Sequence, residues 1–237
     1  MAEIASIDYR DEVEIFEGCV AIEKAGRRPT LLLAPDWAGL HDGMKQIAGR
    51  VASLGFTCFG VDFYGKGIKG NPAGDNSALM GALMGDRAML RRRLLAAYEA
   101  ALKHPGVDPN NVAIMGYCLG GLCALDLARA APAGLKAAMS FHGVLKAPNI
   151  GPQAPITAKI LVMHGWEDPL APPPDVLAFA DEMTAAKADW QLHAYGNTKH
   201  AFTMPTANKP EMGLAYNPAS DRRSWLAMRN FLDEVFV

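Results

Sequence analysis

The 237-residue sequence lacks a strong charge of either sign. It has 23 Lys and Arg residues against 25 Asp and Glu, which gives a formal net charge of −2 at pH 7. Proteins that bind nucleic acids usually carry a basic patch that neutralises phosphates, so this balance argues against a nucleic-acid partner. The segment Met1–Glu12 contains acids and no apolar run, so the sequence predicts no secretory signal.

The chain also lacks a long apolar run of the kind that crosses a membrane. Its longest uncharged stretch, Pro109–Leu125, contains Asn110, Asn111 and three glycines, which do not suit a spanning helix. We therefore expect no membrane partner. With 50% hydrophobic and 8% aromatic residues, the composition is that of an ordinary globular protein. The length suits a single α/β domain over residues 1–237, and nothing in the sequence indicates an oligomeric state.

Cysteines are few, and their spacing excludes two common uses. The four are Cys19, Cys58, Cys118 and Cys123, and no pair has C-x-x-C spacing. Without a secretory signal, they are expected to be reduced thiols in a cytoplasmic protein. The histidines and cysteines show no metal-ligand spacing either, so we predict no metal and no other cofactor.

Short apolar runs typical of buried strands alternate with helical patterns along the chain. The expected strands are Cys19–Ile22, Thr30–Ala34, Thr57–Val61, Val112–Met115, Ala137–Phe141, Ile160–His164 and Trp190–Tyr195. The expected helices are Gly43–Leu54, Arg87–Lys103, Leu119–Ala130, Pro174–Lys187 and Ala219–Val235. This order predicts an α/β fold with a mostly parallel sheet and ligands at the carboxyl ends of its strands. The segment Tyr64–Gly85 is left open between a mobile flap and a long surface connection.

The most informative motif lies at one such strand end, in the stretch NVAIMGYCLGG. Gly116-Tyr117-Cys118-Leu119-Gly120 follows an apolar strand and precedes an apolar helix, as in the nucleophile elbow G-x-S-x-G, with Cys at the nucleophile position. The helix N-terminus favours a thiolate at Cys118. The alternative is that Cys118 is a buried structural cysteine in a glycine-rich turn. Cys123, five residues on, is expected within the helix and is interpreted as a core residue.

If the elbow is catalytic, an acid and then a histidine should follow, each just after a later strand. Asp168 follows the run Ile160–His164, and His200 follows Trp190–Tyr195. Glu167 is the neighbouring alternative for the acid. His142 and His164 also lie at strand ends, but histidines at such positions are more often packed in the core. The remaining histidines are less suited to act as the base, because His41 and His104 lie in connections and His193 lies within a strand.

An oxyanion hole should combine the backbone N–H after the nucleophile with one from the loop after an earlier strand. The first is Leu119, and the second lies in the loop Ala34–Leu40, where Trp37 is favoured. Asp36 of the same loop either faces the site or serves its own turn.

These residues resemble the dienelactone hydrolase family, a cysteine branch of the α/β-hydrolases. The resemblance runs from the strand before Asp36 to the final helix and rests on GYCLGG at Gly116–Gly121, HGWEDP at His164–Pro169 and KHAF at Lys199–Phe202. It implies the α/β-hydrolase fold, with helices on both faces of the sheet. It also implies Cys118 as nucleophile, His200 as base and Asp168 as the residue that orients His200.

The resemblance further implies an acid on the first loop that contacts the resting thiol, a role that the family usually gives to Glu and that Asp36 would take here. Family members acting on dienelactone hold its carboxylate with two arginines. Met204 and the segment Ser77–Gly85 stand where these would be expected. Lys66, Lys69 and Arg87 are the remaining candidates for that contact.

The sequence therefore predicts a hydrolase that cleaves a small carboxylic ester or lactone through a Cys-His-Asp triad and an acyl-enzyme. Expected pocket residues are Tyr64, Tyr117, Trp166, Phe202 and Met204. Two alternatives stay open. One is a thioesterase, or a hydrolase of another carbon–heteroatom bond, with the same triad. The other is a non-catalytic scaffold that acts as a binding protein or thiol sensor.

Overall fold

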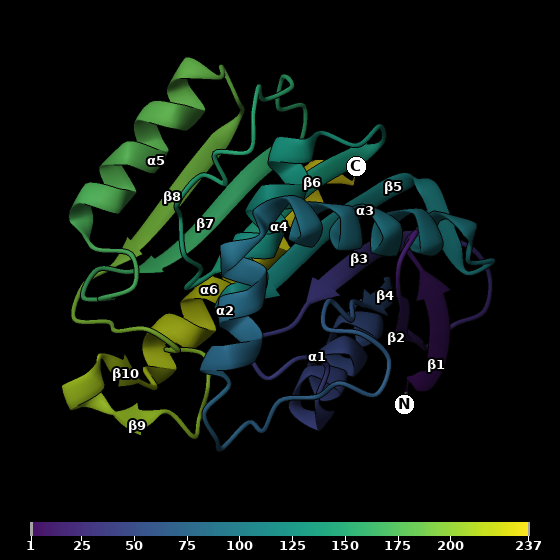
Figure 1. Ribbon diagram of the computed structural model, residues 1–237, viewed down its shortest axis with the longest axis horizontal. Coiled ribbons are helices and arrows are strands. Elements are labelled where there is room, and N and C mark those ends of the chain that lie inside the picture. The colour runs from purple at the N-terminus through teal and green to yellow at the C-terminus, as the bar shows by residue number, and fades with distance from the viewer. Residues whose placement is uncertain (1, 237) are drawn as a thin grey trace.

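The computed structural model describes residues 2–236, and one large sheet organises them (Figure 1). Its eight strands run in the order β1-β2-β4-β3-β5-β6-β7-β8. They are β1 (Glu3–Arg10), β2 (Ile15–Ile22), β3 (Arg28–Ala34), β4 (Thr57–Gly60), β5 (Val107–Tyr117), β6 (Leu135–Phe141), β7 (Lys159–Gly165) and β8 (Trp190–Tyr195). Strands β3 to β8 pair in parallel, whereas β1 and β2 form an antiparallel edge. The sheet is mostly parallel, as the sequence predicts.

Helices cover both faces of this sheet. They are α1 (Asp42–Ser53), α2 (Ser77–Gly85), α3 (Arg87–Lys103), α4 (Leu119–Ala130), α5 (Pro173–Ala185) and α6 (Pro218–Val235). In Figure 1, α3 and α4 lie in front of the strands and α6 lies behind them. Within residues 2–236, no helix is both long and apolar enough to cross a membrane.

Alternation along the strands builds two apolar layers. Leu32 of β3 packs into the layer shared with α3, α4 and α5, and the adjacent Leu31 and Leu33 pack into the layer shared with α1 and α6. All three side chains are fully buried. Because both faces are covered, the central strands are continuous apolar runs, and each such leucine contributes about 1.5–3 kcal/mol by burial.

The structure adds elements where the apolar signal is weak. Strand β1 gives no apolar signal in the sequence, because it is an edge strand with mostly exposed side chains. Helix α2 occupies the last part of the segment Tyr64–Gly85, and it is short and ends at a glycine. A small two-stranded sheet, β9 (Asn208–Lys209) with β10 (Leu214–Ala215), follows β8 and includes a 3₁₀ turn, Pro210–Met212.

Candidate active site

Cys118 occupies a sharp turn between β5 and α4. Its backbone has φ 55° and ψ −116°, in the left-handed half of φ space that non-glycine residues rarely adopt. The Cys118 N–H donates to the Phe141 carbonyl at 3.0 Å, and the Cys118 carbonyl accepts from the Gly121 N–H at 3.0 Å. The residue is therefore held in a strained conformation by neighbours on both sides, with its side chain half-buried.

The glycines of the motif are required by close backbone approaches. A Cβ at Gly116 would lie 2.0 Å from the Gly120 carbonyl oxygen, and one at Gly120 would lie 2.0 Å from the Ala34 carbonyl oxygen. A Cβ at Gly121 would lie 2.6 Å from the Ser140 hydroxyl. These contacts pack the turn against the end of β3 and leave no room for side chains, which explains the glycine spacing of the motif.

The structure brings the three predicted triad residues together. His200 Nε2 lies 3.1 Å from Cys118 Sγ, and His200 Nδ1 lies 2.7 Å from Asp168 Oδ2. His200 and Asp168 are each only 2% exposed. Glu167, the alternative acid, is exposed, so the buried position after β7 belongs to Asp168.

Backbone hydrogen bonds fix the two loops that carry His200 and Asp168. The His200 N–H donates to the Gly213 carbonyl at 2.9 Å, and the Ala215 N–H donates to the His200 carbonyl at 3.1 Å. The segment that forms β10 thereby holds the loop that carries His200 in place. Asp168 Oδ1 accepts from the Leu170 N–H at 2.8 Å, which leaves Oδ2 facing the imidazole.

Electrostatics at His200 favour its charged form. Burial by itself lowers the pKa of this histidine, but the Cys118 thiolate and the hydrogen bonds to Asp168 and Cys118 outweigh burial and raise the pKa to about 10. At neutral pH the arrangement thus suits an imidazolium that donates one N–H to the sulfur and the other to the carboxylate.

The other strand-end histidines remain outside this chain of hydrogen bonds. His142 Nε2 lies 2.8 Å from the Thr203 hydroxyl. Burial, followed by the charge of His200, holds the pKa of His142 well below its usual value. Burial also lowers the pKa of His164, and neither of its ring nitrogens has a hydrogen-bond partner among residues 2–236. Both histidines are packed, and burial disfavours their charged forms.

The predicted oxyanion donors lie on either side of the nucleophile turn. Leu119 begins α4, and Trp37 lies in the loop after β3, whose end contacts the Gly120 backbone. In the part of the chain that the structure describes, neither the Leu119 N–H nor the Trp37 N–H donates to another backbone or side-chain group. Tyr64 donates its hydroxyl hydrogen to the Trp37 carbonyl at 2.8 Å.

Asp36 has partners other than the one that the family resemblance implies. Its Oδ1 accepts from the Ala38 N–H at 2.8 Å, and its Oδ2 lies 3.1 Å from His41 Nε2. Within residues 2–236, no hydrogen bond joins Asp36 to Cys118. Sequence reasoning missed the pairing with His41, which depends on how the loop folds back to begin α1.

Three of the five expected pocket residues, Tyr64, Tyr117 and Phe202, are buried in the core. Tyr117 stacks on Phe141 with 4.5 Å between ring centroids, and it is 5% exposed. Phe202 is fully buried. Alternation along β5 directs Tyr117 into the layer shared with α1 and α6, and Phe202, in the turn after β8, lies in the same layer. Trp166 is 45% exposed and Met204 is half-buried, so these two can contact a ligand.

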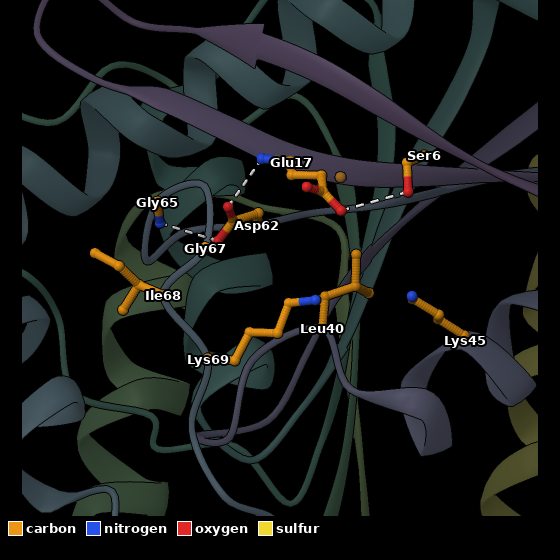
Figure 2. Close-up of a pocket in the computed structure, with 10 residues that line it drawn as sticks. Ser6, Glu17, Leu40, Lys45, Asp62, Gly65, Gly67, Ile68 and Lys69 are labelled. Atoms are coloured by element: carbon orange, nitrogen blue, oxygen red, sulfur yellow. Dashed lines mark hydrogen bonds between the residues drawn. The ribbon is translucent and has the colours of Figure 1, made fainter.

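The three cations considered for binding a substrate carboxylate pair with acidic residues of the chain or lie in a pocket away from the triad residues. Arg87 makes two hydrogen bonds to Asp126, at 2.8 Å and 2.7 Å, in the core. Lys66 pairs with Asp8 of β1. Figure 2 shows Lys69 beside Leu40, in a pocket whose lining includes none of the triad residues.

Within residues 2–236, no group of three or more His, Cys, Asp or Glu side chains could hold a metal ion.

Comparison with known proteins places these features in one family. The model of the dienelactone hydrolase family matches residues 16–236. An uncharacterized protein of Caenorhabditis elegans is 37% identical over 150 residues, which are 62% of this chain and 95% of that protein. An Aquifex aeolicus protein provisionally named carboxymethylenebutenolidase is 25% identical over 86% of this chain and 87% of its own length.

Among solved structures, a dienelactone hydrolase-like promiscuous phosphotriesterase from metagenomic libraries is 37% identical. It superposes with a TM-score of 0.90 over 100% of this chain and 99% of its own. The superposition and the sheet order confirm the α/β-hydrolase fold that the sequence predicts.

Proposed function

The chain belongs to the dienelactone hydrolase family, and we propose that it hydrolyses small uncharged carboxylic esters or lactones with Cys118 as nucleophile. The observation that carries this proposal is the contact of 3.1 Å between Cys118 Sγ and His200 Nε2, with Asp168 2.7 Å behind the imidazole. A nucleophile, a base and a group that orients the base are thus within hydrogen-bond reach of one another.

The first half-reaction is acyl transfer to sulfur. The Cys118 thiolate attacks the carbonyl carbon, and the charge that develops on the carbonyl oxygen is held by the N–H groups of Leu119 and Trp37. When the tetrahedral intermediate collapses, the bond to the leaving oxygen breaks and His200 donates its Nε2 proton to that oxygen. Asp168 keeps the ring in the tautomer and orientation that this transfer needs.

The second half-reaction returns the free thiolate. Neutral His200 accepts a proton from water as the water oxygen attacks the thioester carbonyl. Collapse of the second tetrahedral intermediate expels the Cys118 thiolate and releases the acid. His200 keeps the proton, so the imidazolium–thiolate pair is restored and the cycle closes.

The charges around the site support an uncharged substrate. A substrate carboxylate needs a cation with free N–H groups, but Arg87 is bound by Asp126 and Lys66 pairs with Asp8. Met204 is apolar and half-buried at the position where the family resemblance implies an arginine. A neutral ester or lactone needs no such contact.

The test is a substrate panel with the wild type and Cys118→Ala. We expect turnover of a neutral phenyl ester, a higher kcat/KM for it than for the same ester with a carboxylate on the acyl chain, and no turnover by Cys118→Ala with the fold intact. Mass spectrometry should find an acyl group on Cys118 after rapid quenching. Wild-type activity in Cys118→Ala contradicts the mechanism, and preference for the charged ester contradicts the substrate class. A thiol that never acylates would indicate a binding protein or sensor.

A second candidate is hydrolysis of phosphotriesters, because the phosphotriesterase described above is 37% identical over the whole chain. Phosphotriesters are also uncharged. The thiolate would attack phosphorus and expel an aryloxide, and water would then release the phosphodiester from sulfur. Including a phosphotriester and an acyl thioester in the panel, compared by kcat/KM, ranks these candidates against the carboxylic ester.

A further inference from the structure

We infer that Asp36 and His41 form a positioning pair that holds the loop carrying the Trp37 N–H, and that Asp36 acts through this loop and not on the thiol. The inference rests on the proposed function, in which that N–H stabilises the oxyanion. Its starting observation is the 3.1 Å contact between Asp36 Oδ2 and His41 Nε2, at a carboxylate that is 3% exposed.

The direction of the Trp37 N–H follows from a tight turn. The Gly39 N–H donates to the Asp36 carbonyl at 3.0 Å, which closes a β-turn over Asp36–Gly39. The Asp36 carbonyl and the Trp37 N–H belong to the same planar trans peptide, so they point in opposite directions. With the carbonyl directed into the turn, the Trp37 N–H is directed out of it.

The side chain of Asp36 holds this turn closed. Its Oδ1 accepts from the Ala38 N–H at 2.8 Å, which is the hydrogen bond of an Asx turn. Only one carboxylate oxygen can make that contact, so the rotation of the side chain must be fixed. Oδ2 bound to His41 supplies the second point that fixes it.

The hydrogen bonds of His41 identify its tautomer. Nδ1 accepts from the Gly43 N–H at 3.1 Å as the N-cap of α1, so this nitrogen carries no proton. In the neutral ring the proton is on Nε2, and it is donated to Asp36. The imidazole therefore connects the carboxylate to a helix that packs on the sheet.

Two further contacts hold the rest of the loop. Tyr64 donates to the Trp37 carbonyl at 2.8 Å, and the Gly70 N–H donates to the Ala38 carbonyl at 3.1 Å. Without His41, the turn would keep these contacts but lose the one that fixes the Asp36 side chain. We therefore expect the loop to stay folded with a less well-aligned Trp37 N–H.

Two reactions of the same sulfur separate this role from an effect on the thiol. Acylation by a phenyl ester develops an oxyanion. Alkylation by iodoacetamide forms the S–C bond, breaks the C–I bond and releases iodide without an oxyanion. Loss of one oxyanion donor typically costs about 10²–10³-fold in rate, and a misaligned donor should cost part of that.

Variants of His41 separate its contact with Asp36 from its role as the N-cap of α1. In His41→Asn the side chain can still cap α1 but is too short for Asp36, whereas in His41→Gln it can still reach Asp36. His104→Asn is the matched control, because His104 Nδ1 also accepts from a glycine N–H two residues on, at 3.1 Å, and no carboxylate among residues 2–236 contacts its other nitrogen. We expect His41→Asn to slow acylation about tenfold or more, with alkylation within about twofold of wild type. His41→Gln should acylate faster than His41→Asn, and His104→Asn should match wild type.

Asp36→Asn completes the test. The single amide oxygen of Asn cannot accept from both the Ala38 N–H and His41 Nε2–H, so Asp36→Asn should slow acylation to a similar extent. The double variant should be no slower than either single variant. If Asp36→Asn changes the pH dependence of alkylation, or His41→Asn leaves acylation unchanged, the inference is wrong. If wild-type Cys118 is alkylated but never acylated, the proposed function itself fails.

Discussion

The imidazole of His142 packs edge-on against that of His200, with 5.0 Å between ring centroids and an interplanar angle of 71°. It also makes an edge-to-face contact with Phe202, at 5.2 Å between ring centroids and 78°. His142 has a positive φ of 40°, so a strained backbone directs the ring into this position. Because burial keeps His142 uncharged, it supports the imidazolium of His200 without repelling it.

This packing predicts that size matters more than polarity at residue 142. His142→Phe keeps a ring against His200 and loses one hydrogen bond to Thr203, so kcat/KM should stay within about threefold and stability should fall by about 1 kcal/mol. His142→Ala leaves a cavity behind the His200 ring and should lower kcat/KM about tenfold or more. Steady-state kinetics and urea unfolding measure both. Equal losses of activity in the two variants would indicate that the hydrogen bond, not the packing, is what His200 needs.

The raised pKa of His200 predicts how activity depends on pH. Because the pKa is about 10, His200 stays protonated through neutrality and loses its proton as the pH rises through about 10. An alkyl ester needs that proton for its alkoxide, so its kcat/KM should stay level around pH 7–9 and fall near pH 10. A nitrophenyl ester has a leaving group that departs without a proton, and it should lack this fall. If kcat/KM falls near pH 10 for both substrates, the cause is loss of structure and not deprotonation of His200. Circular dichroism at that pH tests for loss of structure.

The closeness of Cys118, Asp168 and His200 could be predicted because sequence order determines it. In a parallel sheet all carboxyl ends meet at one edge, so an elbow at Cys118, an acid after β7 and a histidine after β8 must lie near one another. The glycines at 116 and 120 are likewise readable, since each marks a backbone contact that excludes a side chain.

The support around the triad could not be predicted in the same way. The Asp36–His41 contact depends on a turn between them and on where α1 begins, which no periodicity shows. Tyr117 was expected in the pocket because it stands beside the nucleophile, but alternation along β5 directs its ring into the opposite layer. Neighbours in sequence on a strand face opposite sides, and the turn at Cys118 does not undo this for Tyr117.

Backbone strain at Cys118 predicts the order of the free energies of unfolding of two variants at this position. Residue 118 has φ 55°, which costs about 1–3 kcal/mol for a residue with a Cβ and little for glycine. Cys118→Gly should therefore unfold with a free energy about 1 kcal/mol higher than Cys118→Ala, although both lack the thiol. Cys123 within α4 is the control. There glycine should be about 1 kcal/mol less stable than alanine. The same order at both positions would mean that the turn is not strained.

A buried ionic network predicts where the fold is most sensitive. Asp126 of α4 accepts from Arg87 at 2.7 Å and 2.8 Å and from Arg129 at 3.3 Å, and both arginines also donate to carbonyls of the chain after β6. Burial raises the pKa of Asp126 even though both arginines oppose this, so the carboxylate has given up much of its hydration.

Removing that carboxylate leaves the Arg87 guanidinium buried without its carboxylate partner, whereas Arg129 keeps its two hydrogen bonds to Glu182. Asp126→Ala should lower the free energy of unfolding by about 3–5 kcal/mol. Lys146 lies in the same segment, 66% exposed and 3.6 Å from Asp175, and Lys146→Ala should cost less than about 1 kcal/mol because water screens that pair. Urea unfolding at one pH compares them directly. Similar losses in the two variants would show that Asp126 does not anchor this segment.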